Sequence, residues 1–202
     1  MIKYRLDKHS DKRGDLYVIE ENNEVSLRYK YYYIIRNDHS NIVVKDPMSL
    51  LVLKGVVESD KYKVDKGTFI SDIYEIGNVS SDFTGLLLSN DRIAELGDAQ
   101  INPGFEVKRI FFVDNMPVGA IRGQHAHKTE KQYLICLNGL IDIKLTSEKK
   151  VISKRLADLE AIYLPPMFWT EIINLKYNSI IPVFASSNYL QEEYITNIED
   201  IY

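Results

Sequence analysis

Two histidines one residue apart, His125 and His127, are the residues of this 202-residue chain best suited to chemistry. They lie in the stretch GAIRGQHAHKTEKQYLICLNG, residues 119–139, where glycines and cations precede an apolar, strand-like run. Residues i and i+2 of a β-strand point to the same face, so both imidazoles can converge on one cavity while Ala126 faces away. This spacing fits three roles: metal ligands, an acid/base pair acting on a bound substrate, or ordinary residues of a sheet.

The segments around the histidines predict an all-β protein. Tyr, Phe, Ile and Val alternate with polar residues in short runs separated by turn signals, which is typical of antiparallel sandwiches and barrels. The tail predicts a short amphipathic C-terminal helix, because its apolar residues fall close to helical spacing. Strands are predicted at residues 16–20, 26–36, 49–57, 68–76, 85–88, 106–113, 132–137, 141–145, 151–156, 161–164, 171–175 and 179–185.

Composition and charge exclude several classes of function. The net charge is −4, and no basic tract with interleaved aromatics is present, so we expect no nucleic-acid partner. The longest apolar stretch, SLLVLKGVV, is too short to cross a bilayer, and the charged N-terminal residues contain no apolar signal segment. We therefore expect a cytoplasmic protein with no membrane partner. The single cysteine, Cys136, lies in an apolar run and is expected to be a buried strand residue.

The spacing around the histidines is similar to the first cupin motif. Five residues separate Gly119 from His125, and four separate His127 from Gln132. Metal-binding cupins carry Glu at the position of Gln132 and a further His at the position of Thr170. Two neutral nitrogens without an anionic ligand make a poor site for a divalent ion, so we expect no metal ion and no other cofactor. The resemblance implies a double-stranded β-helix, or jelly-roll, barrel.

The segment GNVSSDFTG, residues 77–85, is the best candidate for a domain boundary, because Gly, Ser, Asn and Asp dominate it. We predict an additional β-rich N-terminal extension over residues 1–76 and the cupin domain over residues 77–202. The extension has two interpretations. One is a degenerate, cupin-like half produced by duplication, and the other is a set of hairpins whose likeness to the second half is coincidental.

At finer resolution the second half resembles the metal-independent sugar-nucleotide ketoisomerases, which convert dTDP-4-keto-6-deoxyglucose to its 3-keto isomer. The resemblance spans residues 85–202 and is carried by VKRIFFVDNMPVGAIRGQHAHKTEKQYLICLNG, AIYLPPMFWTEI and PVFASSNYLQEEYI. Its most specific element is RGQHAHK, from Arg122 to Lys128. The resemblance implies a homodimer that acts on a dTDP-linked keto-deoxysugar and supplies deoxyamino sugars for surface polysaccharide such as the O-antigen of lipopolysaccharide.

The same resemblance implies roles for individual residues. His125 and His127 form the acid/base pair that moves a proton between C3 and C4, with His127 favoured as the base and the other imidazole stabilising the oxyanion. Arg122, aided by Lys128 or Arg109, binds the pyrophosphate.

Further side chains are assigned to the sugar and the base. Gln132 hydrogen-bonds a sugar hydroxyl. Tyr163 and Trp169 stack on thymine or the hexose, the alternative being that each packs in the core or a dimer interface.

Three positions depart from the ketoisomerase pattern. Phe111 and Phe112 replace a Tyr pair, one member of which assists catalysis, and Thr170 replaces a third imidazole. These departures keep two alternatives open. One is a non-catalytic cupin that binds a nucleotide sugar or a biosynthetic partner, and the other is a related epimerase that uses the same enolisation.

Overall fold

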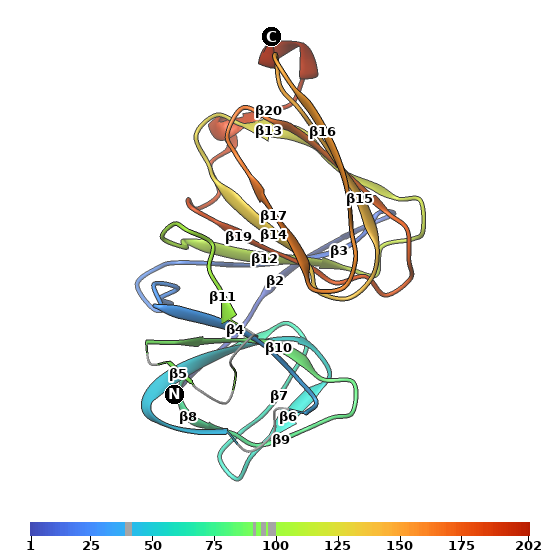
Figure 1. Cartoon of the computed structure of the whole chain (residues 1–202). Helices are drawn as coiled ribbons and strands as arrows, with labels where there is room; N and C mark the ends of the chain where they lie inside the picture. Colours follow the sequence, from blue (N-terminus) through green and yellow to red (C-terminus); the bar gives the residue numbers. More distant parts are fainter. Residues whose placement is uncertain (39–41, 91, 94–95, 97–99) are drawn as a thin grey trace. The chain divides into compact units, whose positions relative to one another are not determined.

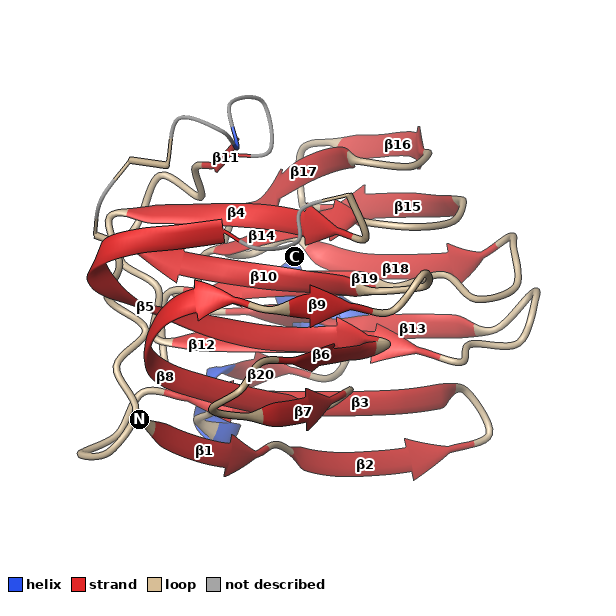
Figure 2. Ribbon diagram, turned by 90° about the horizontal axis from the view of Figure 1, so that it is seen from below, coloured by secondary structure: helices blue, strands red, loops and turns tan. Residues whose placement is uncertain are grey.

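The computed structural model describes residues 1–38, 42–90, 92–93, 96 and 100–202, and its chain divides into two compact units. Unit 1 comprises Met1–Asp7 and Arg28–Asn102, and unit 2 comprises Lys8–Leu27 and Pro103–Tyr202. Strands dominate both units, with only short helical turns in the part that the structure describes (Figure 2). The all-β prediction is confirmed. None of the described helices is long and apolar enough to cross a membrane.

Unit 1 is built from antiparallel strands around its own apolar core, to which Leu50, Ile70 and Leu87 contribute. Its larger sheet has the order β1-β8-β5-β10-β4-β11, and its smaller sheet has the order β7-β6-β9. The strands are β1 (Ile2–Arg5), β4 (Tyr31–Arg36), β5 (Ile42–Lys54), β6 (Val56–Glu58), β7 (Lys63–Asp65), β8 (Thr68–Ile76), β9 (Asn78–Val79), β10 (Thr84–Ser89) and β11 (Gln100–Ile101).

Unit 2 consists of two antiparallel sheets that face each other across an apolar interior (Figure 1). Leu134 and Val183 enter this core from one sheet, and Ile143 and Leu145 enter it from the other. The predicted jelly-roll architecture is confirmed. In sheet order, the first sheet contains β17 (Glu160–Leu164), β14 (Gln132–Cys136), β19 (Ile181–Ala185), β12 (Arg109–Asp114), β3 (Gly14–Glu20) and β2 (Asp7–Asp11), and the second contains β16 (Val151–Leu156), β15 (Ile141–Thr146), β18 (Trp169–Asn174), β13 (Ile121–His127) and β20 (Tyr194–Ile195).

The two units do not divide the chain at residue 77, where turn composition places the boundary. Strand β10, which follows that point, pairs with β4 and β5 inside unit 1. Strand β3, which precedes it by more than 50 residues, pairs from Asp15 to Glu20 with β12 inside unit 2. The larger part of unit 1, Arg28–Asn102, therefore lies in sequence between the two parts of unit 2, and this arrangement follows from long-range strand pairing.

The prediction of a single amphipathic helix at the C-terminus is wrong. The tail makes two 3₁₀ turns, η2 (Gln191–Glu193) and η3 (Ile198–Ile201), separated by the short strand β20. In β20, Tyr194 pairs with His127 and Ile195 pairs with Ala126. So short a helix is marginal in isolation. Main-chain pairing with β13, together with burial of Ile195 against Trp169, stabilises the extended form instead.

Candidate active site

A β-bulge in β13 keeps Arg122 on the same face as His125. Three positions separate the two residues, which would place them on opposite faces of a regular strand. In the structure Arg122 pairs with Ile172, His125 pairs with Thr170, and the register shifts between them. Directly paired residues share a face, and Ile172 packs against the interior core. Arg122 and His125 therefore both face the interior of unit 2.

Glycine at position 123 is what allows this bulge. Gly123 has a φ of +80° and Gln124 a φ of +57°, both in the left-handed region. A Cβ added at Gly123 would lie 2.4 Å from the carbonyl oxygen of Thr170. Since no side chain fits so close to the neighbouring strand, the RGQH sequence specifies the bulge and, through it, the orientation of the site.

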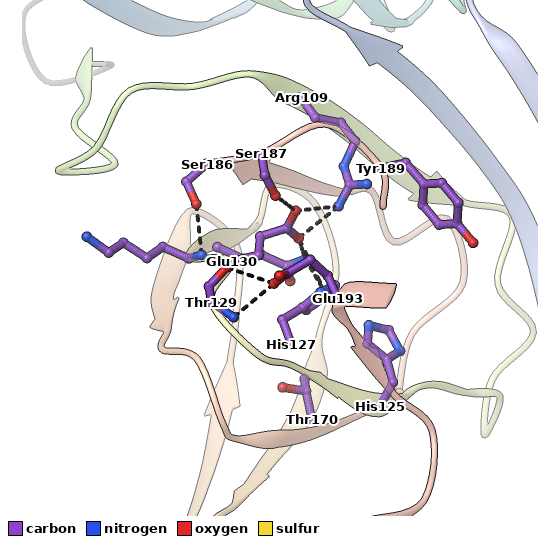
Figure 3. Close-up of polar contacts among 12 residues, drawn as sticks. Arg109, His125, His127, Thr129, Glu130, Thr170, Ser186, Ser187, Tyr189 and Glu193 are labelled. Carbon is purple, nitrogen blue, oxygen red and sulfur yellow. Dashed lines mark hydrogen bonds and ion pairs between the residues drawn. The ribbon is translucent and has the colours of Figure 1, made fainter. Parts of the chain in front are cut away.

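The two imidazoles lie against each other and against a tyrosine from β20. The ring centroids of His125 and His127 are 4.9 Å apart, with the planes at 90° (Figure 3). The ring of Tyr194 lies 5.0 Å from that of His125 and 4.5 Å from that of His127. His127 is buried, whereas His125 is half-buried. The predicted convergence of the two histidines is thus present in the structure.

The carboxylate of Glu130 lies at the centre of a buried hydrogen-bond network beside His127 (Figure 3). Arg109 Nη2 donates to both carboxylate oxygens, at 2.8 and 2.9 Å, and Ser187 Oγ donates to Oε2 at 2.5 Å. Gln132 Nε2 donates to Oε1 at 2.6 Å and lies 3.0 Å from His127 Nε2. Arg109 and Glu130 are each only 3% exposed. This network connects His127 to β14 through Gln132, and through Glu130 to β12 and to the segment that follows β19.

Both imidazoles are held in the neutral state. Burial, with smaller contributions from the nearby His125 and Arg109, lowers the pKa of His127 to about 3 against an opposing effect of Glu193. Burial also lowers the pKa of His125, against a smaller opposing effect from the hydrogen bond to the Gly123 carbonyl. Burial raises the pKa of the Tyr194 phenol, which therefore stays protonated. A neutral imidazole presents one nitrogen that can accept a proton and one N–H that can donate a hydrogen bond, the two functions that enolisation requires.

Arg122 contacts the tip of the β2–β3 hairpin. Its Nε donates to the carbonyl oxygen of Arg13 at 3.2 Å, and its Nη2 lies 3.5 Å from Asp11 Oδ1. Hydrogen bonds from Arg13 lower the pKa of Asp11 to about 2, so this carboxylate is anionic at neutral pH. Lys128, by contrast, has an exposed side chain. Arg122 is the second residue of β13 and Lys128 directly follows its last residue, so the two cations lie at opposite ends of the strand, and Arg122 already contacts an anion.

Two of the predicted site residues lie elsewhere. Trp169 packs with Ala126 and Ile195 on the face of β13 opposite the histidines, so the structure bears out core packing rather than stacking on a ligand. Tyr163 is 43% exposed and points away from the interior, whereas the next residue, Leu164, packs in the core. Alternation along β17 therefore excludes Tyr163 from the face that carries the histidines.

Two predicted ligand contacts are engaged within the protein. Arg109 faces the interior as expected, but its guanidinium pairs with Glu130 and lies 3.8 Å from Glu20. The amide nitrogen of Gln132 contacts Glu130 and His127. Gln132 therefore contacts His127 directly, whereas Arg109 is connected to His127 through Glu130.

Sequence reasoning missed Glu130 and Tyr194. Glu130 stands three residues after His127 among exposed charges, where a solvent-facing loop residue is the usual outcome. Its proximity to the motif was the available signal. Tyr194 fell in a segment with helical spacing, which concealed its place on the same face as His127. In the described part of the chain, no three His, Cys, Asp or Glu side chains are grouped so as to hold a metal ion.

Comparison with known proteins places this geometry in a family. Residues 81–202 match the family described as "FdtA: WxcM-like, C-terminal". The chain belongs to this family. A curated relative from Aneurinibacillus thermoaerophilus, TDP-4-oxo-6-deoxy-alpha-D-glucose-3,4-oxoisomerase, is 30% identical over 101 residues, which cover 49% of this chain and 72% of the relative. Strand β3 precedes the matched segment in sequence, yet it extends the sheet of unit 2 beside β12.

Solved structures with a similar fold include two ketoisomerases. QdtA, a sugar 3,4-ketoisomerase from Thermoanaerobacterium thermosaccharolyticum in complex with TDP, is 24% identical, with a TM-score of 0.47 over 75% of this chain and 93% of that one. WlaRA, a TDP-fucose-3,4-ketoisomerase from Campylobacter jejuni, is 20% identical, with a TM-score of 0.48 over 76% of this chain and 92% of that one.

Proposed function

We propose that this protein is a sugar-nucleotide isomerase that moves the keto group of a dTDP-4-keto-6-deoxyhexose from C4 to C3. The observation that carries the proposal is the pair of neutral, converging imidazoles of His125 and His127. Membership of the FdtA family supports the reaction class, and the name of the curated relative supports the substrate class.

The chemistry is an enolisation followed by its reverse. A base removes the proton from C3, the electron pair forms a C3=C4 double bond, and negative charge develops on the C4 oxygen. Transfer of the C3 hydroxyl proton to the C4 oxygen, protonation at C4 and formation of the C3 carbonyl complete the shift. One imidazole suits the transfer of the carbon-bound proton, and the second suits stabilisation of the oxyanion in a site shielded from water.

We propose Arg122 as the main contact to the diphosphate of the nucleotide. It is the interior-facing guanidinium on the same strand as the histidines, and a guanidinium matches phosphate oxygens with two parallel hydrogen bonds. Lys128 adds a flexible, exposed charge. Binding in this mode requires the diphosphate to displace Asp11, which contacts Arg122 in the structure.

The setting proposed for this reaction is the cytoplasm, with a homodimer as the working form. The product would be the 3-keto precursor of a 3-amino-3,6-dideoxyhexose for surface polysaccharide such as the O-antigen of lipopolysaccharide. The reaction would proceed without a metal ion or other cofactor, because enolisation beside a carbonyl needs only a base and a hydrogen-bond donor.

A binding protein without catalytic activity is the second candidate. Phe111 supports it, because its ring packs against the interior core and brings no hydroxyl to the site. Calorimetric binding of dTDP-4-keto-6-deoxyglucose, followed by NMR analysis of the same mixture, separates the two candidates. Appearance of the 3-keto isomer is the expected result. Binding with the sugar unchanged would establish the non-catalytic function, and a 4-keto sugar inverted at a ring carbon would establish an epimerase.

A further inference from the structure

We infer that this chain is a duplicated jelly roll, with a first copy from β2 to β10 and a second copy from β11 to β20. The first copy lacks a site of its own and instead completes the site of the second copy with one of its strands. The first half of the chain thereby gains a function that the proposed reaction does not give it. This architecture does not depend on which reaction the site catalyses.

The two units repeat the same strand order. After the edge strand β1, the larger sheet of unit 1 runs β8-β5-β10-β4-β11, and the first sheet of unit 2 runs β17-β14-β19-β12-β3. The other sheets run β7-β6-β9 in unit 1 and β16-β15-β18 in unit 2. Each strand from β4 to β10 thus takes the same place as its counterpart from β12 to β19, once β13 is left out. In these runs of the larger sheets no two neighbours are consecutive in sequence, so a chance assembly of hairpins does not account for the agreement.

The agreement extends to the register of individual residues. In each unit, four aliphatic or aromatic side chains from four adjacent strands lie opposite one another in a row across the larger sheet. The row in unit 2 is Ile162, Leu134, Val183 and Phe111. The row in unit 1 is Ile70, Leu50, Leu87 and Tyr33. Each row packs in the interior core of its own unit, as two copies of one fold require.

Unit 1 has no room for a counterpart of β13, the strand that carries both histidines. In unit 2, residues 115–131 connect β12 to β14 and include β13. In unit 1, β4 ends at Arg36 and β5 begins at Ile42, which leaves only residues 37–41. So short a segment cannot form a seven-residue strand with a loop on each side, and its His39 is the only histidine of residues 28–102. Unit 1 therefore cannot present a pair of imidazoles, and one chain carries one such site.

Each copy passes its leading strand to the other unit. Strand β3 is the strand immediately before β4 in sequence, yet it pairs with β12 in unit 2. Strand β11 is the strand immediately before β12, yet it pairs with β4 in unit 1. The two strands take equivalent places, since Val18 lies opposite Phe111 and Gln100 lies opposite Tyr33. Exchange of an identical element between two copies is the arrangement of a swapped dimer, here within a single chain.

The strand donated by the first copy reaches the site in unit 2. Strand β3 spans seven residues, whereas β11 spans two. Glu20, the last residue of β3, accepts a hydrogen bond from the backbone nitrogen of Tyr189 at 2.5 Å. The ring of Tyr189 lies 5.3 Å from that of Tyr194, which contacts both imidazoles. Before the other end of β3, the carbonyl of Arg13 accepts from Arg122, so the donated hairpin contacts the site at both ends.

Disulfide cross-linking of the full-length protein tests the exchange. Residues directly opposite each other in antiparallel strands lie about 4.5–5.5 Å apart at Cα, within the range of a disulfide. In a Cys136→Ala background, Leu16→Cys with Val113→Cys joins β3 to β12. In the same background, Tyr32→Cys with Ile101→Cys joins β11 to β4. After oxidation and denaturation without reductant, we expect both disulfides to lie within one chain, so that the mass remains that of a single chain.

Lys144→Cys with Ser153→Cys is the matched control, because the β15–β16 hairpin must close within one chain. Disulfides that double the mass would overturn the inference, since the exchanged strands would then come from a second chain. Failure of either pair to cross-link while the control closes would equally overturn it. If the first pair prevents folding, Val18→Cys with Phe111→Cys joins the same two strands and decides the same question.

A mixing experiment tests whether β3 completes the site of its own chain. Glu20→Lys places a cation beside Arg109, and His127→Asn removes an imidazole, so we expect each variant to be inactive. When the two variants are unfolded and refolded together, activity should stay absent, because every chain builds its site with its own β3. Recovery of activity, or an active Glu20→Lys protein, would overturn the role of the first copy. The cross-links are read without substrate, so they decide the exchange even if the protein does not isomerise a keto sugar.

Discussion

Arg109 and Glu130 form an ion pair inside unit 2 in which one guanidinium nitrogen donates to both carboxylate oxygens. Each residue is 3% exposed, so Glu130→Ala leaves a buried cation without its partner. We expect this variant to lose about 3–5 kcal/mol of unfolding free energy, measured by urea denaturation. The control is Asp142→Ala, which removes the partner of Arg155 in a solvent-exposed pair and should change the unfolding free energy far less, because water and salt screen exposed ion pairs. Equal losses in the two variants would contradict a buried, structural role for Glu130.

The bulge at Gly123 predicts a contrast between two glycines of the same segment. Gly123→Ala places a Cβ 2.4 Å from the Thr170 carbonyl oxygen, in addition to the strain of a positive φ. Gly119→Ala has a similar φ of +82° but meets nothing within 4 Å. Both variants should lose about 1 kcal/mol from backbone strain. Only Gly123→Ala should also lose most activity, because His125 would be displaced, and retention of full activity would show that the bulge is dispensable.

The lowered pKa of His127 predicts a loss of stability in acid. An unfolded histidine takes up a proton near pH 6.5, whereas the folded one does so only at about pH 3. Between these values the unfolded state binds more protons, so the unfolding free energy should fall with falling pH by up to about 1.4 kcal/mol per unit from this residue. Urea denaturation from pH 7 to pH 4 measures the slope. His127→Gln should show a shallower slope, and an unchanged slope would place the pKa of His127 near its ordinary value.

Arg122 predicts an effect on substrate binding rather than on the chemical step. Arg122→Ala should raise KM by about tenfold or more, the loss expected for a charge-assisted hydrogen bond, with kcat nearly unchanged. Asp11→Asn should lower KM, because the diphosphate would no longer displace an anion from Arg122. Lys144→Ala, on the outer face of β15 beside Glu171, is the control for the loss of one positive charge. A higher KM in Asp11→Asn would mean that Asp11 positions Arg122 for binding.

Periodicity and spacing predicted the features that depend on neighbouring residues. The alternation of β8 and β16 gave their bounds, and the i, i+2 rule placed His125 and His127 on one face. The partners of the histidines depend on contacts between distant segments and were not predictable in this way. Glu130 is paired because Arg109 approaches from β12, and Tyr194 reaches the site because β20 pairs with β13.

Contacts between distant segments also explain why the domain boundary and the faces of two aromatic side chains were predicted wrongly. Strand β3 joins unit 2 through pairing with β12 across the whole of unit 1, and no local composition records that pairing. Trp169 and Tyr163 were selected as aromatic residues near the motifs. Their faces depend on the register of β18 and β17, in which Thr170 and Leu164 point inward instead.

Deuterium incorporation during incubation with dTDP-4-keto-6-deoxyglucose in heavy water, followed by NMR, tests proton transfer by the histidine pair most directly. The wild-type protein should form the 3-keto isomer with deuterium at C4 and should exchange the C3 hydrogen of the remaining substrate. His127→Ala should abolish both signals while nucleotide-sugar binding stays within about tenfold of wild type, because an alanine cannot carry the proton. Binding by the wild-type protein with neither isomer nor exchange would contradict the proposed isomerase function.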